Sequence, residues 1–431
     1  MLPSQLHSAL ADLDEQGLRR RRRVLDGVQG ARVVLDGREY LSFTSNDYLG
    51  LAGHPAIAAA AQAAAAEFGV GAGAAHLLSG HHRLHETLEQ ELAAFVGMPA
   101  ALLFSTGYMA NLGVIQALLD RHGEVFEDRL NHASLVDAAL LSRAKLSRYP
   151  HLDLVTLERQ LAASSARVKL IASDTVFSMD GDLAPVAELL ALAEKYDAWL
   201  YLDDAHGFGV LGEAGEGATS LLTVPVREGV PGETFSPLFQ RGAGGDLRTS
   251  ERAQPLEKSP PAPLLQRGGQ PPPRLIYLAT LGKAAGVSGA FVAGSDELVE
   301  WLVNKARTYI YTTAQPPLLA AAVSASLKLI AAEPWRRRRL AELVARLKAG
   351  MAGLPWTLLA SDTPIQPLLV GDAHASLALA DGLRQRGILI PAIRPPTVPN
   401  GTARLRVSLS AAHTVEDVDE LLAALRALAV A

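Results

Sequence analysis

Short apolar runs of strand length recur along this chain, and segments with helical periodicity separate them. The runs are Ala100–Phe104, Val168–Ser173, Trp199–Asp203, Leu275–Ala279 and Gly289–Ala293. The segments expected to be helical are Ala56–Phe68, His85–Phe95, Tyr108–Leu119 and Pro185–Tyr196. Parallel strands need a long crossover connection, which is usually a helix. The alternation therefore predicts an α/β fold with a mostly parallel central sheet flanked by helices.

The pattern changes at both ends of this region and divides the chain into three parts. Residues 1–50 are expected to form an N-terminal arm, with a polar helical stretch over residues 5–23 and a short hairpin over residues 32–41. Residues 51–295 form the predicted large domain. Residues 296–431 begin with helical segments and continue into a smaller C-terminal α+β domain.

Two local patterns stand out in the C-terminal part. An amphipathic helix is predicted over residues 415–428, and Thr414 with Asp417 resembles a capping box at its start. The arginine run 336–339 is interpreted as the solvated face of a helix, because charge runs usually face water.

Residues 223–273 do not fit the α/β pattern. Ten prolines and seven glycines fall within residues 224–273, and an imperfect repeat relates residues 237–242 to residues 263–268. Such a composition buries too little apolar surface to offset the entropy of ordering. The segment is therefore expected to be a low-complexity, disordered insertion that the fold does not need.

Composition excludes several classes of function. With 40 basic against 45 acidic residues, the chain offers no electrostatic reason to bind nucleic acid or an anionic membrane. The absence of cysteine excludes disulfides, thiolate nucleophiles and Cys-ligated metal centres, and we expect no metal at the catalytic site. No secretory signal is apparent, and the alanine-rich window 58–78 is too polar to span a membrane. A cytoplasmic protein is expected.

Two segments end predicted strands with residues suited to catalysis. Lys283 follows the strand at 275–279 between glycines and could form a Schiff base, although a lysine after a strand is more often a surface residue. Asp203 and His206 follow another strand, at the sheet edge where open α/β folds bind ligands. Taken alone, this second pair is equally open to a metal site or to helix capping.

Further segments add a phosphate cradle. Gly107 and Tyr108 begin a predicted helix directly after a strand, and helix N-termini bind phosphate. His132 lies in an Asn-His-Ala-Ser segment, where a lone histidine is often structural. The glycines at 69–73 follow a helix instead of a strand, so they are not a dinucleotide fingerprint. A phosphate cradle, a carboxylate, a histidine and a lysine together suit pyridoxal 5'-phosphate (PLP).

The sequence resembles the α-oxoamine synthases, fold-type I PLP enzymes that condense an amino acid with an acyl thioester. The matching segments are residues 43–50, 131–135, 176–182, 203–207, 287–289, 393–399 and 401–406. They span nearly the whole chain except the proline-rich insertion, and their combination is specific. The glycine-rich stretch after the first helix is less serine-rich than is usual in the family.

The resemblance implies a role for each matching residue. Lys283 carries the cofactor, Asp203 pairs with the pyridine nitrogen, His206 contacts the ring hydroxyl, and His132 stacks on the ring. The residues implied to hold the cofactor, mainly around its phosphate, are Gly107, Tyr108, Ser178 and Thr280, together with Thr312 and Thr313 from the second subunit of a homodimer.

The substrates are implied in the same way. Arg406, with Asn46 nearby, takes the carboxylate of the amino acid, and Arg20 matches a position that contacts the acyl substrate. Arg394 and Thr397 lie in an Arg-Pro-Pro-Thr-Val-Pro segment closest to the biotin-pathway branch of the family. A guanidinium can pair with the free carboxylate of a pimeloyl chain, although Arg394 could instead bracket a turn. The implied substrates are L-alanine and pimeloyl-CoA or pimeloyl-acyl-carrier protein (pimeloyl-ACP).

Other interpretations remain open at this point. Glycine C-acetyltransferase, 5-aminolevulinate synthase and serine palmitoyltransferase share the pattern around Lys283, Asp203 and His206. A non-catalytic partner subunit and a decayed copy are the alternatives outside the enzyme class, and the intact lysine argues against the first of them.

Overall fold

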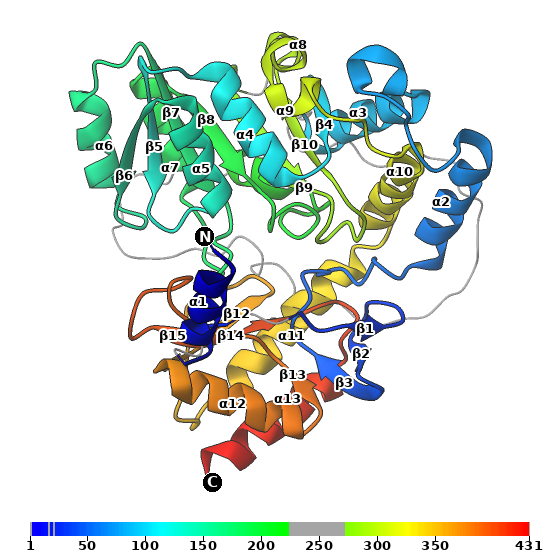
Figure 1. Ribbon diagram of the computed structural model, residues 1–431, viewed down its shortest axis with the longest axis vertical. Coiled ribbons are helices and arrows are strands. Elements are labelled where there is room, and N and C mark those ends of the chain that lie inside the picture. Colours follow the sequence, from blue (N-terminus) through cyan, green and yellow to red (C-terminus); the bar gives the residue numbers. More distant parts are fainter. Residues whose placement is uncertain (1, 16–17, 20–21, 224–271, 431) are drawn as a thin grey trace, which may run out of the picture.

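A computed structural model describes residues 2–15, 18–19, 22–223 and 272–430. The described chain forms a larger α/β part and a smaller part below it in the view of Figure 1. Nearly all of the predicted insertion, residues 224–271, lies outside the described residues.

A seven-stranded sheet forms the centre of the larger part, in the order β4-β10-β9-β8-β7-β5-β6. Its strands are β4 (Ala100–Phe104), β5 (Gly123–Asp128), β6 (Lys145–Tyr149), β7 (Val168–Asp174), β8 (Trp199–Asp203), β9 (Leu275–Thr280) and β10 (Ala290–Gly294). The pairs among β5 to β9 are parallel, and β10 runs antiparallel to both β9 and β4. Because β10 follows β9 after a short connection, it can only return in the opposite direction. The predicted mostly parallel sheet is confirmed, whereas β5 and β6 were not predicted.

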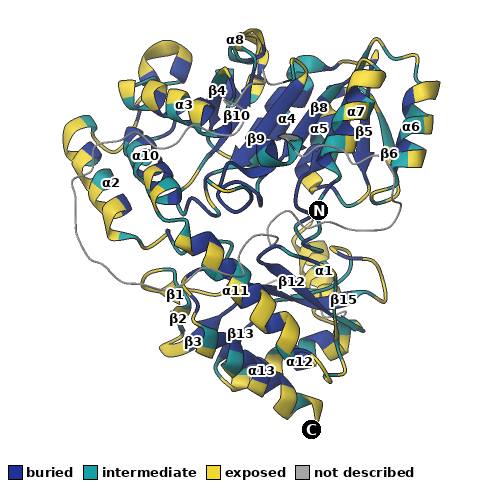
Figure 2. Ribbon diagram, turned by 180° about the vertical axis from the view of Figure 1, so that it is seen from behind, coloured by how far each residue is buried: buried dark blue, intermediate teal, exposed yellow. Residues whose placement is uncertain are grey.

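Helices cover both faces of this sheet. They are α2 (Pro55–Phe68), α3 (Arg83–Val96), α4 (Gly107–Leu118), α5 (Ala133–Ser142), α6 (Leu154–Ala163), α7 (Val186–Lys195), α8 (Asp296–Lys305), α9 (Arg307–Ile310) and α10 (Pro317–Ala332), with the π-helix η1 (His76–Gly80) and the 3₁₀-helix η2 (Gly217–Thr223). Successive residues of β4 alternate between two cores, with Leu103 in one and Leu102 and Phe104 in the other. Figure 2 shows the strands buried and the outer helix surfaces exposed.

The smaller part holds two four-stranded sheets, β1-β2-β3-β13 and β11-β12-β15-β14. The strands are β1 (Leu25–Asp26), β2 (Arg32–Leu35), β3 (Arg38–Ser42), β11 (Thr357–Leu358), β12 (Ile365–Gly371), β13 (Ile388–Leu389), β14 (Ala392–Ile393) and β15 (Ala403–Ser408). The helices are α11 (Trp335–Gly350), α12 (Ala373–Gln385) and α13 (Val415–Ala429). The predicted hairpin is confirmed as β2–β3, and β3 pairs with β13, so the hairpin is built into the smaller part.

The bounds of two helices, α1 and α13, can be compared with the predictions. The capping box at Thr414 is confirmed, with reciprocal hydrogen bonds between Thr414 and Asp417. The N-terminal helix is shorter than predicted: α1 covers Pro3–Glu15, and the polar stretch does not continue as a helix to residue 23.

The interpretation of the arginine run 336–339 as a solvated face is wrong for its first two members. Arg336 and Arg337 are buried. Arg336 donates to the Leu49 carbonyl and pairs with Glu333, and Arg337 donates to the carbonyls of Ile330 and Glu213. A guanidinium carries five donors in a rigid fork, so it can be buried where several backbone carbonyls converge.

Among the described residues, no single helix is long and apolar enough to cross a membrane. The bent pair α10 and α11 passes that test only when the two helices are taken together.

Candidate active site

The predicted catalytic residues converge where the parallel strands end. Asp203 is the last residue of β8, His206 lies three residues further on, and Lys283 follows β9. The Lys283 Nζ lies 2.8 Å from Nε2 of His206, whose Nδ1 lies 2.6 Å from the Tyr48 hydroxyl. These residues come together because β8 and β9 are parallel neighbours, so their carboxyl ends lie at the same edge of the sheet.

Burial makes Lys283 less basic than an ordinary lysine. Desolvation lowers the pKa of Lys283 to about 8, and the carboxylates of Asp203 and Asp174 only partly oppose that effect. Burial likewise lowers the pKa of His206 well below its usual value, with the positive charge of Lys283 contributing. At pH 7 about a tenth of the lysine is therefore neutral, far more than for an ordinary lysine, and it lies beside a neutral imidazole, which suits both nucleophilic attack and proton transfer.

Asp203 is held rigidly in this cluster. Its Oδ2 accepts a hydrogen bond from Asn111 Nδ2 (2.8 Å), and its Oδ1 accepts one from the Ala205 backbone N–H (3.1 Å). The Asn111 amide also donates to Ser134 and accepts from the Tyr201 hydroxyl at 2.6 Å. This buried network fixes the orientation of a carboxylate that is itself almost fully buried.

His132 and Asp174 flank the same edge. His132 is the N-cap of α5, where its Nδ1 lies 2.7 Å from the Ser134 hydroxyl. Its backbone N–H donates to Oδ2 of Asp174, the last residue of β7. The other Asp174 oxygen, Oδ1, is buried and has no hydrogen-bond partner within the described part of the chain. Burial and the adjacent Asp203 raise the pKa of Asp174 well above its usual value.

The start of α4 lies against the strand that precedes Lys283. Thr106 caps this helix by accepting from the Met109 N–H. A Cβ at Gly107 would lie 2.6 Å from Cγ2 of Thr280, so only glycine allows this approach. The helix N-terminus, with its unpaired backbone N–H groups, thereby lies next to the strand end that carries Lys283. Tyr108 is half exposed and donates to Asp137.

Arg406 projects from β15 of the smaller part and is buried. Its guanidinium donates to four neutral oxygens: the Ser178 carbonyl (2.6 Å), Asn46 Oδ1 (3.1 Å), the Ser408 hydroxyl (2.7 Å) and the Tyr48 hydroxyl (3.3 Å). Arg404, two residues earlier, forms an ion pair with Asp180 at 2.5 Å. Within the described residues, Arg406 has no such carboxylate, so its buried charge is available to an anion.

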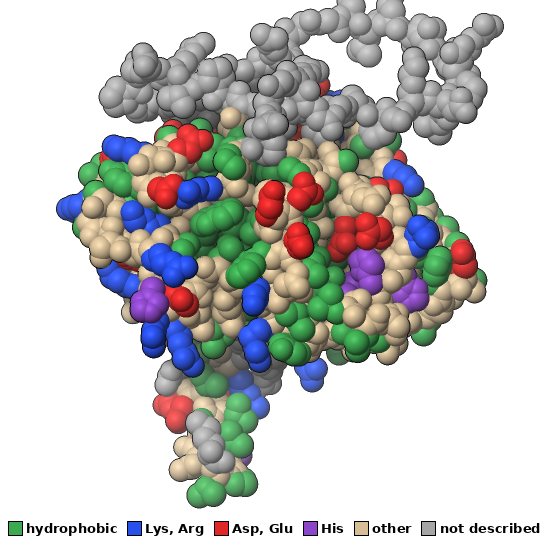
Figure 3. All heavy atoms as spheres, turned by 90° about the horizontal axis from the view of Figure 1, so that it is seen from above, with side chains coloured by type: hydrophobic (Ala, Val, Ile, Leu, Met, Phe, Trp, Pro, Cys, Tyr) green, Lys and Arg blue, Asp and Glu red, His purple; other side chains and the backbone are tan. Residues whose placement is uncertain are grey.

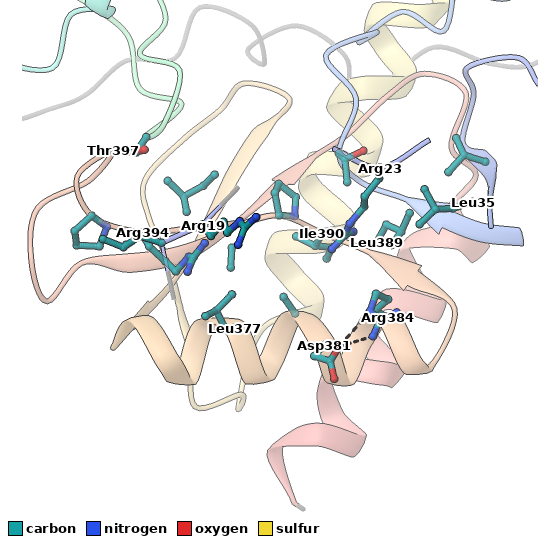
Figure 4. Close-up of a pocket in the computed structure, with 18 of the residues that line it drawn as sticks. Arg19, Arg23, Leu35, Leu377, Asp381, Arg384, Leu389, Ile390, Arg394 and Thr397 are labelled. Carbon is teal, nitrogen blue, oxygen red and sulfur yellow. Dashed lines mark hydrogen bonds and ion pairs between the residues drawn. The ribbon is translucent and has the colours of Figure 1, made fainter. Parts of the chain in front are cut away.

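A cavity of about 970 Å³ opens beside this site in the smaller part (Figure 4). Arg394 and Thr397 line it, together with Arg19 and Arg23 of the N-terminal segment. Its floor includes α12, where Asp381 and Arg384 form an ion pair. Lys283 does not line this cavity, but Thr44 does, two residues before Asn46 of the Arg406 cluster.

Two further predicted residues, Thr312 and Thr313, lie outside the cluster. Thr312 and Thr313 follow α9, and among the described contacts neither hydrogen-bonds to the Lys283 cluster. Arg20 lies outside the described residues.

A family model described as "Aminotransferase class I and II" matches residues 38–425. The chain belongs to this family. A relative from Nitrosomonas eutropha, named 8-amino-7-oxononanoate synthase, is 55% identical over 429 residues, a coverage of 100% for each chain to the nearest per cent. A relative of the same name from Thiobacillus denitrificans is 56% identical and covers 99% of this chain and 98% of its own. Within the family, the chain groups with the 8-amino-7-oxononanoate synthases.

Solved structures of family members agree. Serine palmitoyltransferase from Sphingomonas wittichii has a TM-score of 0.82 at 26% identity, covering 99% of this chain and 96% of that one. The 8-amino-7-oxononanoate synthase from Francisella tularensis has a TM-score of 0.70 at 27% identity, covering 90% and 97%. Another serine palmitoyltransferase structure, also at 0.82 and 26%, is described as containing PLP as an internal aldimine. The resemblance to the α-oxoamine synthases is confirmed.

Three residues of the cluster were not predicted as site residues from the sequence. Tyr48 links His206 to Arg406, Asp174 accepts from the His132 N–H, and Asn111 holds Asp203. Two of them leave a sequence signal. Asn111 is the polar residue among the buried residues of α4, and Asp174 directly follows a predicted apolar strand, much as Asp203 ends another.

Proposed function

We propose that this chain is a PLP-dependent enzyme that condenses L-alanine with a pimeloyl thioester, with loss of carbon dioxide, to give 8-amino-7-oxononanoate for biotin synthesis. The observation that carries the proposal is the buried Lys283, whose Nζ lies 2.8 Å from His206 at the sheet edge that also carries Asp203. Relatives more than 50% identical over nearly the whole chain bear the name of that activity.

The residues present fit PLP. Lys283 would hold the aldehyde carbon, Asp203 the ring nitrogen, His206 the ring hydroxyl, and His132 the ring face. The α4 N-terminus at Gly107, with Tyr108, Thr280 and Ser178, would hold the phosphate. The unpartnered Oδ1 of Asp174 and the glycine-only approach at Gly107 are features of an edge shaped for a polar ligand. When bound, PLP supplies an electron sink for a carbanion at the amino-acid α carbon.

Residues of the chain itself would stabilise the ring charge, transfer the proton and bind the amino-acid carboxylate. Asp203, fixed by Asn111 and the Ala205 N–H, holds negative charge opposite the ring nitrogen. Lys283, with its pKa lowered to about 8, accepts the proton from the α carbon and later returns it. Arg406 binds the carboxylate of alanine, with Asn46 and Tyr48 fixing its guanidinium plane.

The acyl donor is assigned to the arginine-lined cavity. Arg394 and Thr397 lie on its wall, and a pimeloyl chain ends in a carboxylate that a guanidinium can pair with. Arg20 is proposed to contact the same substrate. The donor is pimeloyl-CoA or pimeloyl-ACP. The active form is proposed to be a cytoplasmic homodimer, in which Thr312 and Thr313 reach the phosphate of the partner's cofactor.

Three measurements test the proposal. Borohydride reduction of PLP-loaded protein should attach the cofactor to the peptide containing Lys283, and attachment to another lysine would refute the assignment. Turnover should be faster with L-alanine and pimeloyl thioester than with glycine and acetyl-CoA, and the reverse order would favour glycine C-acetyltransferase. Arg394→Ala should raise KM for the pimeloyl donor by roughly 10-fold to 100-fold, as one lost charge-assisted contact implies, and leave alanine binding unchanged.

A further inference from the structure

A histidine and two glutamates converge at the start of α3, outside the active site. His81 lies just before the helix, and Glu86 and Glu89 lie one turn apart within it. The His81 Nε2 is 3.2 Å from Glu86 Oε2 and 4.0 Å from Glu89 Oε2. In Figure 3, acidic and histidine side chains gather side by side on the flank that carries α3.

A second group, His76, His81 and His85, is also close enough to share an ion. His85 is already occupied, however, because its Nδ1 accepts from the His82 N–H and its Nε2 faces the Gln315 carbonyl at 2.9 Å. An imidazole with both nitrogens used cannot also bind a metal. The set of His81, Glu86 and Glu89 is therefore the better candidate.

Each of these three side chains is held by a further partner that leaves one ligand atom directed inward. The Nδ1 of His81 lies 2.9 Å from Nδ1 of His76. Oε1 of Glu86 accepts from Gln90, and Oε1 of Glu89 accepts from the Leu103 N–H. Such outer partners orient metal ligands in proteins and fix the histidine tautomer.

The supports are themselves rigid. The ring of His76 is 7% exposed and stacks on Tyr309, with 5.0 Å between centroids and 12° between planes. The Glu89 side chain is 12% exposed and its partner Leu103 belongs to β4. Glu86, in contrast, is 57% exposed, which leaves an open side from which an ion and its waters can enter.

We propose that His81, Glu86 and Glu89 bind a divalent transition-metal ion, with Zn²⁺ as the preferred species. One imidazole nitrogen and two carboxylate oxygens suit Zn²⁺ or Mn²⁺ better than Mg²⁺, which takes oxygen ligands and keeps its waters. In tetrahedral coordination, ligands at about 2.1 Å from the ion lie about 3.4 Å apart. The Glu89 oxygen, now 4.0 Å from Nε2 of His81, would therefore move closer by about 0.6 Å, which a side chain of this length allows. The ion would fasten η1 and α3 to β4 and would take no part in the chemistry at Lys283.

The test uses PLP-loaded protein stripped of metal by a chelator and dialysed against ZnCl₂, with bound zinc measured by elemental analysis. Wild type should bind one Zn²⁺ per chain and unfold at a higher temperature with zinc than without. His81→Ala and Glu86→Gln should lose the tight site, with affinity reduced by at least 10-fold to 100-fold, and should lose the thermal shift. Glu86 is exposed, so Glu86→Gln tests the site even if His81→Ala folds poorly.

Control variants separate this site from adventitious binding. His122→Ala and Glu67→Gln change exposed residues of the same types elsewhere and should bind zinc as wild type does. Loss of binding in Glu86→Gln, but not in Glu67→Gln, supports the assignment. The assignment would be overturned if wild type bound no stoichiometric zinc, or if wild type and Glu86→Gln bound zinc equally. The three side chains would then be held together by hydrogen bonds and ion pairs without a metal ion.

Discussion

His151 joins two carboxylates at the edge of the sheet, and its removal should destabilise the protein in a pH-dependent way. Its Nδ1 lies 3.0 Å from Asp128 Oδ1, and its Nε2 lies 2.7 Å from Asp182 Oδ2. These two carboxylates raise the pKa of His151 from 6.5 to about 10, against the opposing effect of desolvation. The imidazole is therefore positively charged throughout the neutral range.

The magnitude follows from linkage. Because the folded-state pKa exceeds the unfolded value, the stabilisation is fully present below pH 6.5 and disappears as the pH rises through about 10. With these two pKa values, proton linkage gives an upper bound of about 4 kcal/mol at pH 7, about 1 kcal/mol at pH 9 and near zero at pH 10.5, because solvent screens part of the interaction at a half-buried histidine. Removing one partner of a buried ion pair costs about 3–5 kcal/mol in other proteins, which agrees.

The perturbation is His151→Gln, which removes the charge and keeps a hydrogen-bonding side chain. An amide can retain one hydrogen bond worth about 0.5–1.5 kcal/mol, so the free energy of unfolding should fall by about 2.5–4 kcal/mol at pH 7. Urea unfolding, followed by circular dichroism at pH 7, 9 and 10.5, measures the difference between variant and wild type.

The difference should shrink steadily as the pH rises and be below about 1 kcal/mol at pH 10.5. His122→Gln, an exposed histidine, is the matched control and should change stability by less than about 0.5 kcal/mol at every pH. A His151→Gln difference that stays constant from pH 7 to 10.5, or that is absent at pH 7, would refute the linkage argument.

Three further variants test other contacts. Asn111→Ala leaves Oδ2 of Asp203 without its donor, while the Ala205 N–H still reaches Oδ1, so PLP affinity, measured by equilibrium dialysis, should fall about 5-fold to 100-fold with the fold intact. Arg406→Lys should raise KM for L-alanine about 10-fold, whereas Arg404→Lys should change it far less, because Arg404 already pairs with an acid. Arg337→Met removes the donor to the buried Ile330 carbonyl and to the Glu213 carbonyl, and should lower the free energy of unfolding by about 1–3 kcal/mol, read from urea midpoints.

The central sheet could be predicted well because its strands carry a local signal. The run at 100–104 is continuously apolar, the run at 199–203 is apolar up to its final Asp203, and the structure has strands with those bounds. The strand at 123–128 was missed because Glu124, Glu127 and Asp128 interrupt its apolar pattern, although all three are buried. Acidic residues are almost never expected inside a sheet, so tertiary contacts override the local pattern here.

The sequence could predict which residues form the site, but not which hydrogen-bond partners hold them. Lys283, Asp203 and His206 follow strands, which is a local signal for a ligand site. The contact from Tyr48 to His206 crosses 158 positions, and that from Asn111 to Asp203 crosses 92. No local sequence pattern connects residues so far apart. The burial of Arg336 and Arg337 was not predicted for the same reason, because their carbonyl acceptors at Leu49 and Glu213 lie far away in the sequence.

Arg404 and Arg406 show how much of the recognition depends on such distant contacts. They have the same residue type, the same strand and the same buried face, since residues two apart in a strand point to the same side. The difference lies in the loop after β7. Its Asp180 neutralises Arg404, whereas its Ser178 presents only a carbonyl to Arg406. Asp182 of the same loop contacts His151. The ion pair at His151 therefore helps to hold this loop in place. The loop neutralises Arg404 but not Arg406, so only Arg406 keeps a charge that can bind a substrate carboxylate.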